Sequence, residues 1–239
     1  MTSVLTKLLS LALFACLIAS VMSAGPIAPC PTASVAVYVA LTGPCQIGSL
    51  EFSDFAYTNT YFPTLPGPPA SAVTVTPSSN PANPGLDLSA AWNVSSGAGM
   101  DSALTYLVQT VSGAPTIDQA VFGITDNIVS QPVSIQFSET LCVGVAIGPG
   151  QCPAANKIFL VVQDPQSSVS FAPVSVMTIS NDIYIKANGN GSGMISDVSN
   201  GLPTPEPGIP LLSFSGLLAL GLMARVGAHR RRLRNCTAD

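Results

Sequence analysis

The chain has 239 residues, a net charge of −4 at pH 7 and only 8% charged residues. Between residues 25 and 204, called the body below, two lysines face ten Asp and Glu residues, so the body carries a net charge of −8. An acidic body repels phosphate backbones, which argues against nucleic acid as a partner. The single histidine, His229, lies outside the body, which excludes Ser-His-Asp catalysis and histidine-ligated zinc there.

Residues 1–24 predict a signal peptide. One lysine, Lys7, precedes an almost wholly apolar run over residues 8–22, and the small residues Ser23 and Ala24 follow, as signal peptidase requires. We therefore expect signal peptidase to release the body. With about 180 residues, the secreted domain at 25–203 is long enough to form one domain with a sizeable core.

Four cysteines fall in the body: Cys30, Cys45, Cys142 and Cys152. An even number in an exported chain indicates disulfides, and four cysteines allow three connectivities. We predict the local pairs Cys30–Cys45 and Cys142–Cys152, because each closes a short segment that contains Gly and Pro. Each bond is expected to stabilise the fold by about 2–3 kcal/mol. The alternative, a metal site, lacks a CxxC spacing or a histidine, so no metal and no cofactor are expected.

The pattern of the body predicts a mainly β fold, an antiparallel β-sandwich. Short stretches rich in Val, Ile, Thr, Phe and Tyr alternate with turn residues. The expected strands are 50–57, 72–76, 86–93, 103–111, 117–124, 133–143, 157–162, 169–179, 182–187 and 193–198. Residues 33–41 fit a strand or a short helix, and a proline-rich loop is expected over 63–85, with an edge strand at 73–76. The Asn and Gly residues of 188–191 predict a hairpin connection; the alternative, a calcium loop, lacks acidic ligands.

Few residues of the body are candidates for catalysis. Glu51 and Asp54 are the carboxylate pair that a glycosidase mechanism would use. Their spacing of three places them on opposite faces of a regular strand, where carboxylates serve mainly to solvate the surface. We therefore expect no catalytic residue.

Aromatic side chains are the candidates for sugar binding, since an aromatic face offers apolar contact beside a polar edge. The residues in question are Trp92, Tyr57, Tyr61 and Tyr106. A single tryptophan in a β domain is more typical of the core, and we predict that Trp92 lies there.

The C-terminal segment, 204–239, combines three features. The triplet Pro205, Glu206 and Pro207 precedes an apolar run, 209–226, and a basic tail, 227–239, which contains Arg230, Arg231, Arg232 and Arg234. As a helix, the apolar run would be about 27 Å long, close to the hydrocarbon thickness of a bilayer. Because arginines favour the cytoplasmic side, the order of these features predicts one transmembrane helix with the body outside the cell membrane.

This order of triplet, span and arginine cluster resembles the PEP-CTERM sorting signal of Gram-negative bacteria. The resemblance implies that an exosortase-type membrane protease recognises Pro205, Glu206 and Pro207, and that the arginines of 230–234 form a retention signal. A plain anchor that is never cut is the alternative, because the physics of the span is the same. The body also resembles a group of acidobacterial PEP-CTERM proteins without an assigned activity, through its motifs at 45–48, 52–57, 139–142 and 180–185. That likeness implies a fold only.

Together these features predict an exported, non-catalytic protein of the cell surface or exopolysaccharide matrix, with a structural or adhesive role. Its C-terminal helix would hold it in the inner membrane before sorting, and its expected partners are signal peptidase, exosortase and exopolysaccharide. The alternatives are a secreted carbohydrate-active enzyme with paired carboxylates, or an ice-binding or carbohydrate-binding surface protein. Ice binding is the weaker of these, because the Thr-Val-Thr segment at 74–76 occurs once and makes no array.

Overall fold

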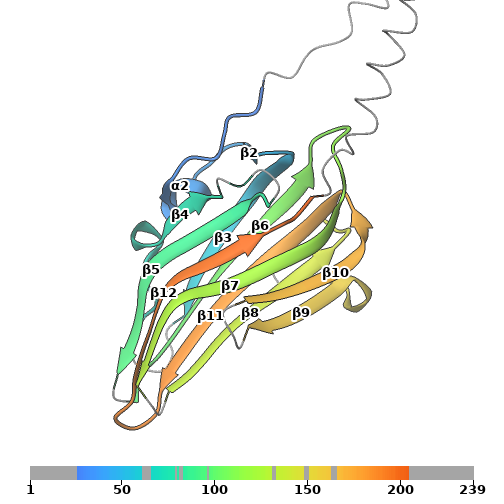
Figure 1. Ribbon diagram of the computed structural model, residues 1–239. Coiled ribbons are helices and arrows are strands. Elements are labelled where there is room, and N and C mark those ends of the chain that lie inside the picture. Colours follow the sequence, from blue (N-terminus) through green and yellow to red (C-terminus); the bar gives the residue numbers. More distant parts are fainter. Residues whose placement is uncertain are drawn as a thin grey trace, which may run out of the picture.

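The computed structural model describes residues 26–60, 66–78, 80, 83–95, 97–130, 133–147, 151–162 and 166–204. These residues form two six-stranded antiparallel sheets that pack face to face (Figure 1). The mainly β, antiparallel sandwich predicted from the sequence is confirmed. No helix within the described ranges is long and apolar enough to cross a membrane. The signal peptide, the triplet, the predicted helix at 209–226 and the basic tail lie outside the described residues.

The first sheet has the strand order β1-β4-β5-β12-β7-β10 and the second has the order β2-β3-β6-β11-β8-β9. The strands of the first sheet are β1 (Ala33–Ser34), β4 (Thr74–Pro77), β5 (Gly85–Ser95), β7 (Ile117–Ser130), β10 (Gln166–Val174) and β12 (Ser192–Gly201). Those of the second are β2 (Cys45–Ile47), β3 (Leu50–Thr60), β6 (Gly99–Thr110), β8 (Val133–Val143), β9 (Lys157–Val162) and β11 (Val176–Ala187). The short helices are α2 (Val35–Val39) and the 3-10 turns η1 (Ala70–Ala72) and η2 (Ala154–Asn156).

Several local predictions need correction. The break predicted between 179 and 182 is absent, because Ser180 and Asn181 continue β11 and the chain turns at Ser175 instead. The turn at 188–191 is present, but it links β11 of the second sheet to β12 of the first, so it is not a hairpin. The strand predicted at 73–76 is not at the edge, since β4 pairs with both β1 and β5. The ambiguous segment 33–41 contains both a short strand and a helix.

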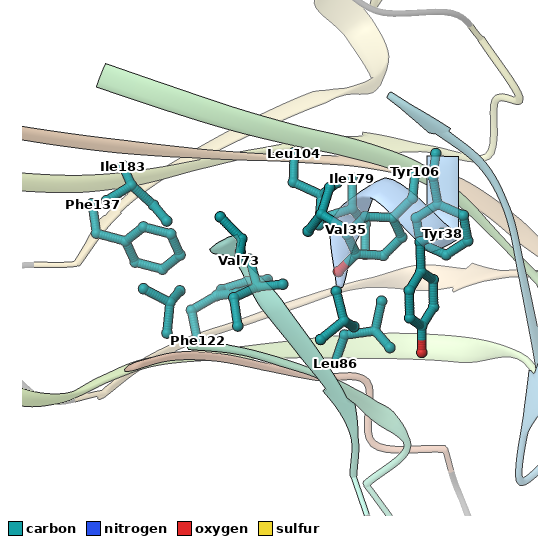
Figure 2. Close-up of a cluster of buried hydrophobic side chains, with 14 of the residues drawn as sticks. Val35, Tyr38, Val73, Leu86, Leu104, Tyr106, Phe122, Phe137, Ile179 and Ile183 are labelled. Carbon is teal, nitrogen blue, oxygen red and sulfur yellow. The ribbon is translucent and has the colours of Figure 1, made fainter. Parts of the chain in front are cut away.

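One hydrophobic core fills the space between the sheets. Inward side chains of both sheets meet there, for example Leu104 and Phe137 of the second sheet and Phe122 of the first (Figure 2). At one end α2 inserts Tyr38, whose ring packs edge-on against Phe55 at 4.9 Å between centroids. Full burial of a large apolar side chain is worth about 1.5–3 kcal/mol, so this layer supplies the main driving force for folding.

Trp92 belongs to this core, as predicted. It is 1% exposed, and its indole N–H donates to the Ser102 hydroxyl at 2.9 Å. The bond joins β5 of the first sheet to β6 of the second and satisfies the one polar atom of a buried indole. Trp92 is therefore a link between the sheets.

Both predicted disulfides are present. Cys30–Cys45 has a Cα–Cα distance of 4.7 Å, and Cys142–Cys152 has one of 5.5 Å. The first encloses β1 and α2, and the second fixes the loop that follows β8. Each bond joins two cysteines that are next to each other in the order of the four cysteines along the chain.

Candidate functional site

The alternative of an aromatic sugar-binding platform is not formed by the described residues. Tyr106 is 1% exposed and, like Trp92, lies in the core. Tyr57 is half-buried, and its hydroxyl donates to the carbonyl of Pro68 at 2.6 Å. Tyr61 lies outside the described residues. A sugar-stacking surface therefore requires other side chains.

Asp54 lies at an irregularity in β3. The register between β3 and β6 shifts between Ser53 and Ala56, so three steps along β3 match two steps along β6. Asp54 takes φ 53°, and it is the one non-glycine residue with positive φ among the described residues. Aspartate tolerates this left-handed conformation better than most residues, and such backbone positions cluster at functional sites.

The bulge corrects the prediction for the Glu51 and Asp54 pair. Glu51 lies between the buried Leu50 and Phe52, so it points to the face of the second sheet that is turned away from the core. This face is called the outer face below. Asp54 lines a pocket on the same face. Regular alternation would have separated the two carboxylates, and the extra residue in β3 removes that separation.

The pocket has a volume of about 230 Å³. Its lining comes from the bulge, from β6 and β11, and from the loop after β8: Asp54, Thr105, Tyr106, Leu107, Ala146, Ile147 and Thr178. It combines a carboxylate and two hydroxyls with apolar side chains. This mixture is typical of sites for small polar ligands that also present apolar surface.

The loop wall of the pocket is tied down by hydrogen bonds. The backbone N–H of Ile147 donates to the Thr178 hydroxyl at 3.1 Å, and that hydroxyl lies 3.2 Å from the carbonyl oxygens of Val145 and Ile147. The Asn156 side chain donates to the carbonyl of Val143 at 2.8 Å. Together with the Cys142–Cys152 bond, these contacts hold the loop against the sheet and so preform the pocket.

A row of hydroxyl groups crosses the outer face from this pocket to the sheet edge. Thr105, Ser180, Thr140 and Phe159 are successive cross-strand partners on β6, β11, β8 and β9. The first two are hydrogen-bonded at 3.0 Å. Phe159 ends the row with 54% of its surface exposed. With strands about 4.8 Å apart, the row is about 14 Å long, and we call it the outer row.

Two interacting carboxyl groups lie beside the outer row. Asp182 of β11 and Asp101 of β6 are diagonal neighbours on the outer face, since Asp182 pairs with Ala103 and Asp101 with Tyr184. Burial, a hydrogen bond with Asp101 and repulsion by its charge raise the pKa of Asp182 to about 7. Asp182 therefore keeps its proton to a higher pH than an ordinary aspartate does. No group of three or more His, Cys, Asp or Glu side chains able to hold a metal lies within the described ranges.

No protein-family model and no curated protein matches this sequence. Among solved structures, TmCBM61 in complex with β-1,4-galactotriose has 12% sequence identity and a TM-score of 0.30; the similarity covers 62% of this chain and 88% of that one. The enzymatically active domain of tailspike protein 4 of bacteriophage CBA120 has 12% identity and a TM-score of 0.29, over 66% of this chain and 20% of the other. At such scores neither likeness bears on what this chain does.

The sequence singled out Asp54 and Tyr106 among the residues of this site but did not indicate the others. Among the described residues Phe159 is an exposed aromatic side chain, yet in the sequence it lies within an apolar strand, Lys157–Val162, with nothing to mark it as outward. Thr105, Ser180 and Thr140 come together only through strand pairing. Alternation along each strand predicts which residues share a face, but not which strands are neighbours.

Proposed function

We propose that this chain is an exported, non-catalytic protein of the cell surface or exopolysaccharide matrix, and that it adheres to a hydroxyl-rich glycan through the pocket and the outer row. The observation that carries the proposal is the preformed pocket, continued by three hydroxyl residues to an exposed phenyl ring. Sugar rings present hydroxyls at their edges and C–H groups on their faces, which match these two kinds of contact. The net charge of the body disfavours strongly anionic glycans.

The two disulfides support the export part of the proposal, because such bonds persist mainly in oxidising compartments. The proposal includes sorting by the PEP-CTERM-like tail. Replacing Pro205, Glu206 and Pro207 by alanine should leave uncleaved protein in the inner membrane, detected by fractionation and immunoblotting. Normal processing of this variant would instead favour a plain anchor or another protease.

The carboxyl pair favours binding over glycoside hydrolysis. Asp101 is close enough to Asp182 for a hydrogen bond between the two carboxyl groups. Glycosidases hold their two carboxyl groups about 5–10 Å apart, to leave room for the sugar carbon or a water molecule. A carboxyl group that keeps its proton beside a second carboxyl group is suited to donating and accepting hydrogen bonds with a bound polar ligand.

Glycan adhesion is tested by retention of the purified exported protein on native exopolysaccharide. Asp54→Asn keeps the shape of the side chain and its tolerance of positive φ, and should weaken retention about tenfold through loss of charged hydrogen bonds. Glu51→Gln is the matched control, with the same charge change on the same strand and face but outside the pocket. Retention that falls equally in both variants would point to net charge and contradict the pocket.

Phe159 provides a second, independent test. Phe159→Ala removes the exposed ring and should lower retention several-fold, as expected when an aromatic contact worth about 0.5–1.5 kcal/mol is lost. Val37→Ala is the control, since Val37 is 47% exposed on α2. Unchanged retention of Phe159→Ala would remove the sheet edge from the binding surface.

A further inference from the structure

A cluster of polar side chains lies inside the hydrophobic core. Glu139 of β8 and Asn181 of β11 are directly opposite each other across the strand pair. Tyr106 of β6 is a diagonal neighbour of Asn181, because Asn181 pairs with Leu104. Asn200 of β12 comes from the facing sheet. Directly opposed side chains have Cβ atoms about 5 Å apart, so these residues share one small volume. We call them the inner cluster.

The inner cluster is almost completely removed from solvent. Glu139 and Asn181 are 0% exposed, Tyr106 is 1% and Asn200 is 3% exposed. Figure 2 shows Tyr106 reaching into the layer between the sheets, among apolar side chains such as Ile179 and Leu104. The cluster therefore lies between the two sheets, shielded from solvent.

None of the polar side-chain atoms of the inner cluster has a hydrogen-bond partner. This holds for both carboxyl oxygens of Glu139, for the oxygen and nitrogen of both amides, and for the Tyr106 hydroxyl. Burial and then the charge of Glu139 raise the pKa of the Tyr106 hydroxyl well above its usual value, and the nearby amides of Asn181 and Asn200 lower it by less. They still form no hydrogen bond of ordinary geometry. Buried polar groups in folded proteins are almost always satisfied, so the cluster requires a partner of its own.

We propose that the inner cluster binds a hard monovalent cation, a sodium ion, which joins the two sheets. Its donors are the two oxygens of Glu139, the amide oxygens of Asn181 and Asn200, and the hydroxyl oxygen of Tyr106. Oxygen donors alone select hard cations over zinc or copper, which prefer nitrogen and sulfur. A cation would satisfy all five oxygens at once, which no single hydrogen-bond donor in the core can do.

The charge of the inner cluster selects the charge of the ion. Glu139 is its single carboxylate, so a monovalent cation gives a neutral site, whereas a calcium ion would leave a positive charge in the core. Uncompensated buried charge is strongly unfavourable. Magnesium is disfavoured because it keeps several of its waters, for which a closed core offers little room. This site is independent of glycan binding on the outer face.

The position of the cluster gives the ion a structural role. Asn200 is the one contribution from the first sheet, and it lies on β12 between β5 and β7. The other three ligands lie on β6, β11 and β8, three adjacent strands of the second sheet. The ion would therefore connect an inner strand of the first sheet to three inner strands of the second, in addition to the apolar contacts around it.

The site is tested with the full-length protein in salts of equal ionic strength. Tm is measured by thermal melting in sodium chloride, choline chloride and calcium chloride. Sodium should raise Tm of the wild type by about 3 °C over choline. Glu139→Gln should abolish this rise, and Glu51→Gln, which removes a carboxylate on the outer face, should retain it. Equal Tm in sodium and choline, a sodium effect that persists in Glu139→Gln, or stabilisation by calcium in place of sodium would each overturn the proposal.

A second variant keeps the test decisive if Glu139→Gln does not fold. Asn200→Asp adds a second carboxylate to the inner cluster, so a divalent ion would now give the neutral site. Calcium should raise Tm of this variant by at least as much as sodium raises that of the wild type. The assignment would be overturned if calcium raised the Tm of Asn200→Asp no more than it raises that of the wild type. It would also be overturned if the variant failed to fold in all three salts.

Discussion

Replacing Glu139 by glutamine should change how the stability of the protein depends on pH. The two side chains have the same shape, but only glutamate can be ionised. Burial raises the pKa of Glu139 well above its usual value of 4.5. The folded state therefore holds a proton that the unfolded state releases as pH rises past 4.5. Stability from this group is complete below that pH and is lost as the pH rises through the folded pKa.

The magnitude follows from proton linkage. Between 4.5 and the folded pKa, the wild type binds one more proton when folded than when unfolded, which lowers its free energy of unfolding by about 1.4 kcal/mol per pH unit. Glu139→Gln lacks this proton. The variant should therefore gain on the wild type by about that amount for each pH unit in this interval. Asp87 and Asp182, whose pKa values are also raised, are present in both proteins and cancel in the difference.

The assay is urea denaturation at pH 4, 5, 6 and 7 in choline chloride, so that sodium does not compensate the carboxylate. Free energies of unfolding are compared at each pH, and the slopes with urea show whether both proteins expose the same surface on unfolding. Parallel pH profiles for Glu139→Gln and wild type would refute the reasoning. That result would mean that Glu139 titrates alike in the folded and unfolded states.

Three further predictions concern packing, crosslinking and the outer face. Gly85→Ala should destabilise the fold by more than about 2 kcal/mol, because a Cβ there would overlap the backbone carbonyl of Asn200, whereas Gly43→Ala, which meets nothing within 4 Å, should be nearly neutral in urea melts. Removing the Cys142–Cys152 bond with two Cys→Ser changes should cost about 3 kcal/mol for a crosslink over ten residues, and should also weaken glycan retention by freeing the pocket loop. The Tm of Asp182→Asn minus that of the wild type should be larger at pH 8 than at pH 5. The pKa of Asp182 is raised to about 7, so the wild type loses stability as the pH rises through that value, whereas the variant has no proton to lose there.

The features that sequence predicted well are local ones. The sequence predicted a strand at 133–143, and β8 has these bounds. Cys30 and Cys45 are close in sequence, as are Cys142 and Cys152. The short segment between the two cysteines of each pair favoured their pairing. The sandwich itself followed from the repeated apolar stretches and turns.

The features that sequence missed depend on distant strands. The bulge at Asp54 is a mismatch in length between β3 and β6, which no property of β3 alone reveals. The expected strands 169–179 and 182–187 left Asn181 in the gap between them. In the structure it is fully buried in the middle of β11. Rules that place apolar residues in the core do not predict a buried polar residue such as Asn181. Such exceptions are expected at functional or strained sites, and Asn181 belongs to the inner cluster.

The position of β12 has a mechanical consequence. This last strand of the described chain is not at an edge but between β5 and β7, and it pairs with both along nearly its whole length. A load applied through residues that follow Thr204 would pull along this strand and strain both hydrogen-bond ladders in shear, all bonds at once. A tethered protein built this way resists drag at the surface better than one tethered by an edge strand, whose bonds can be peeled away singly.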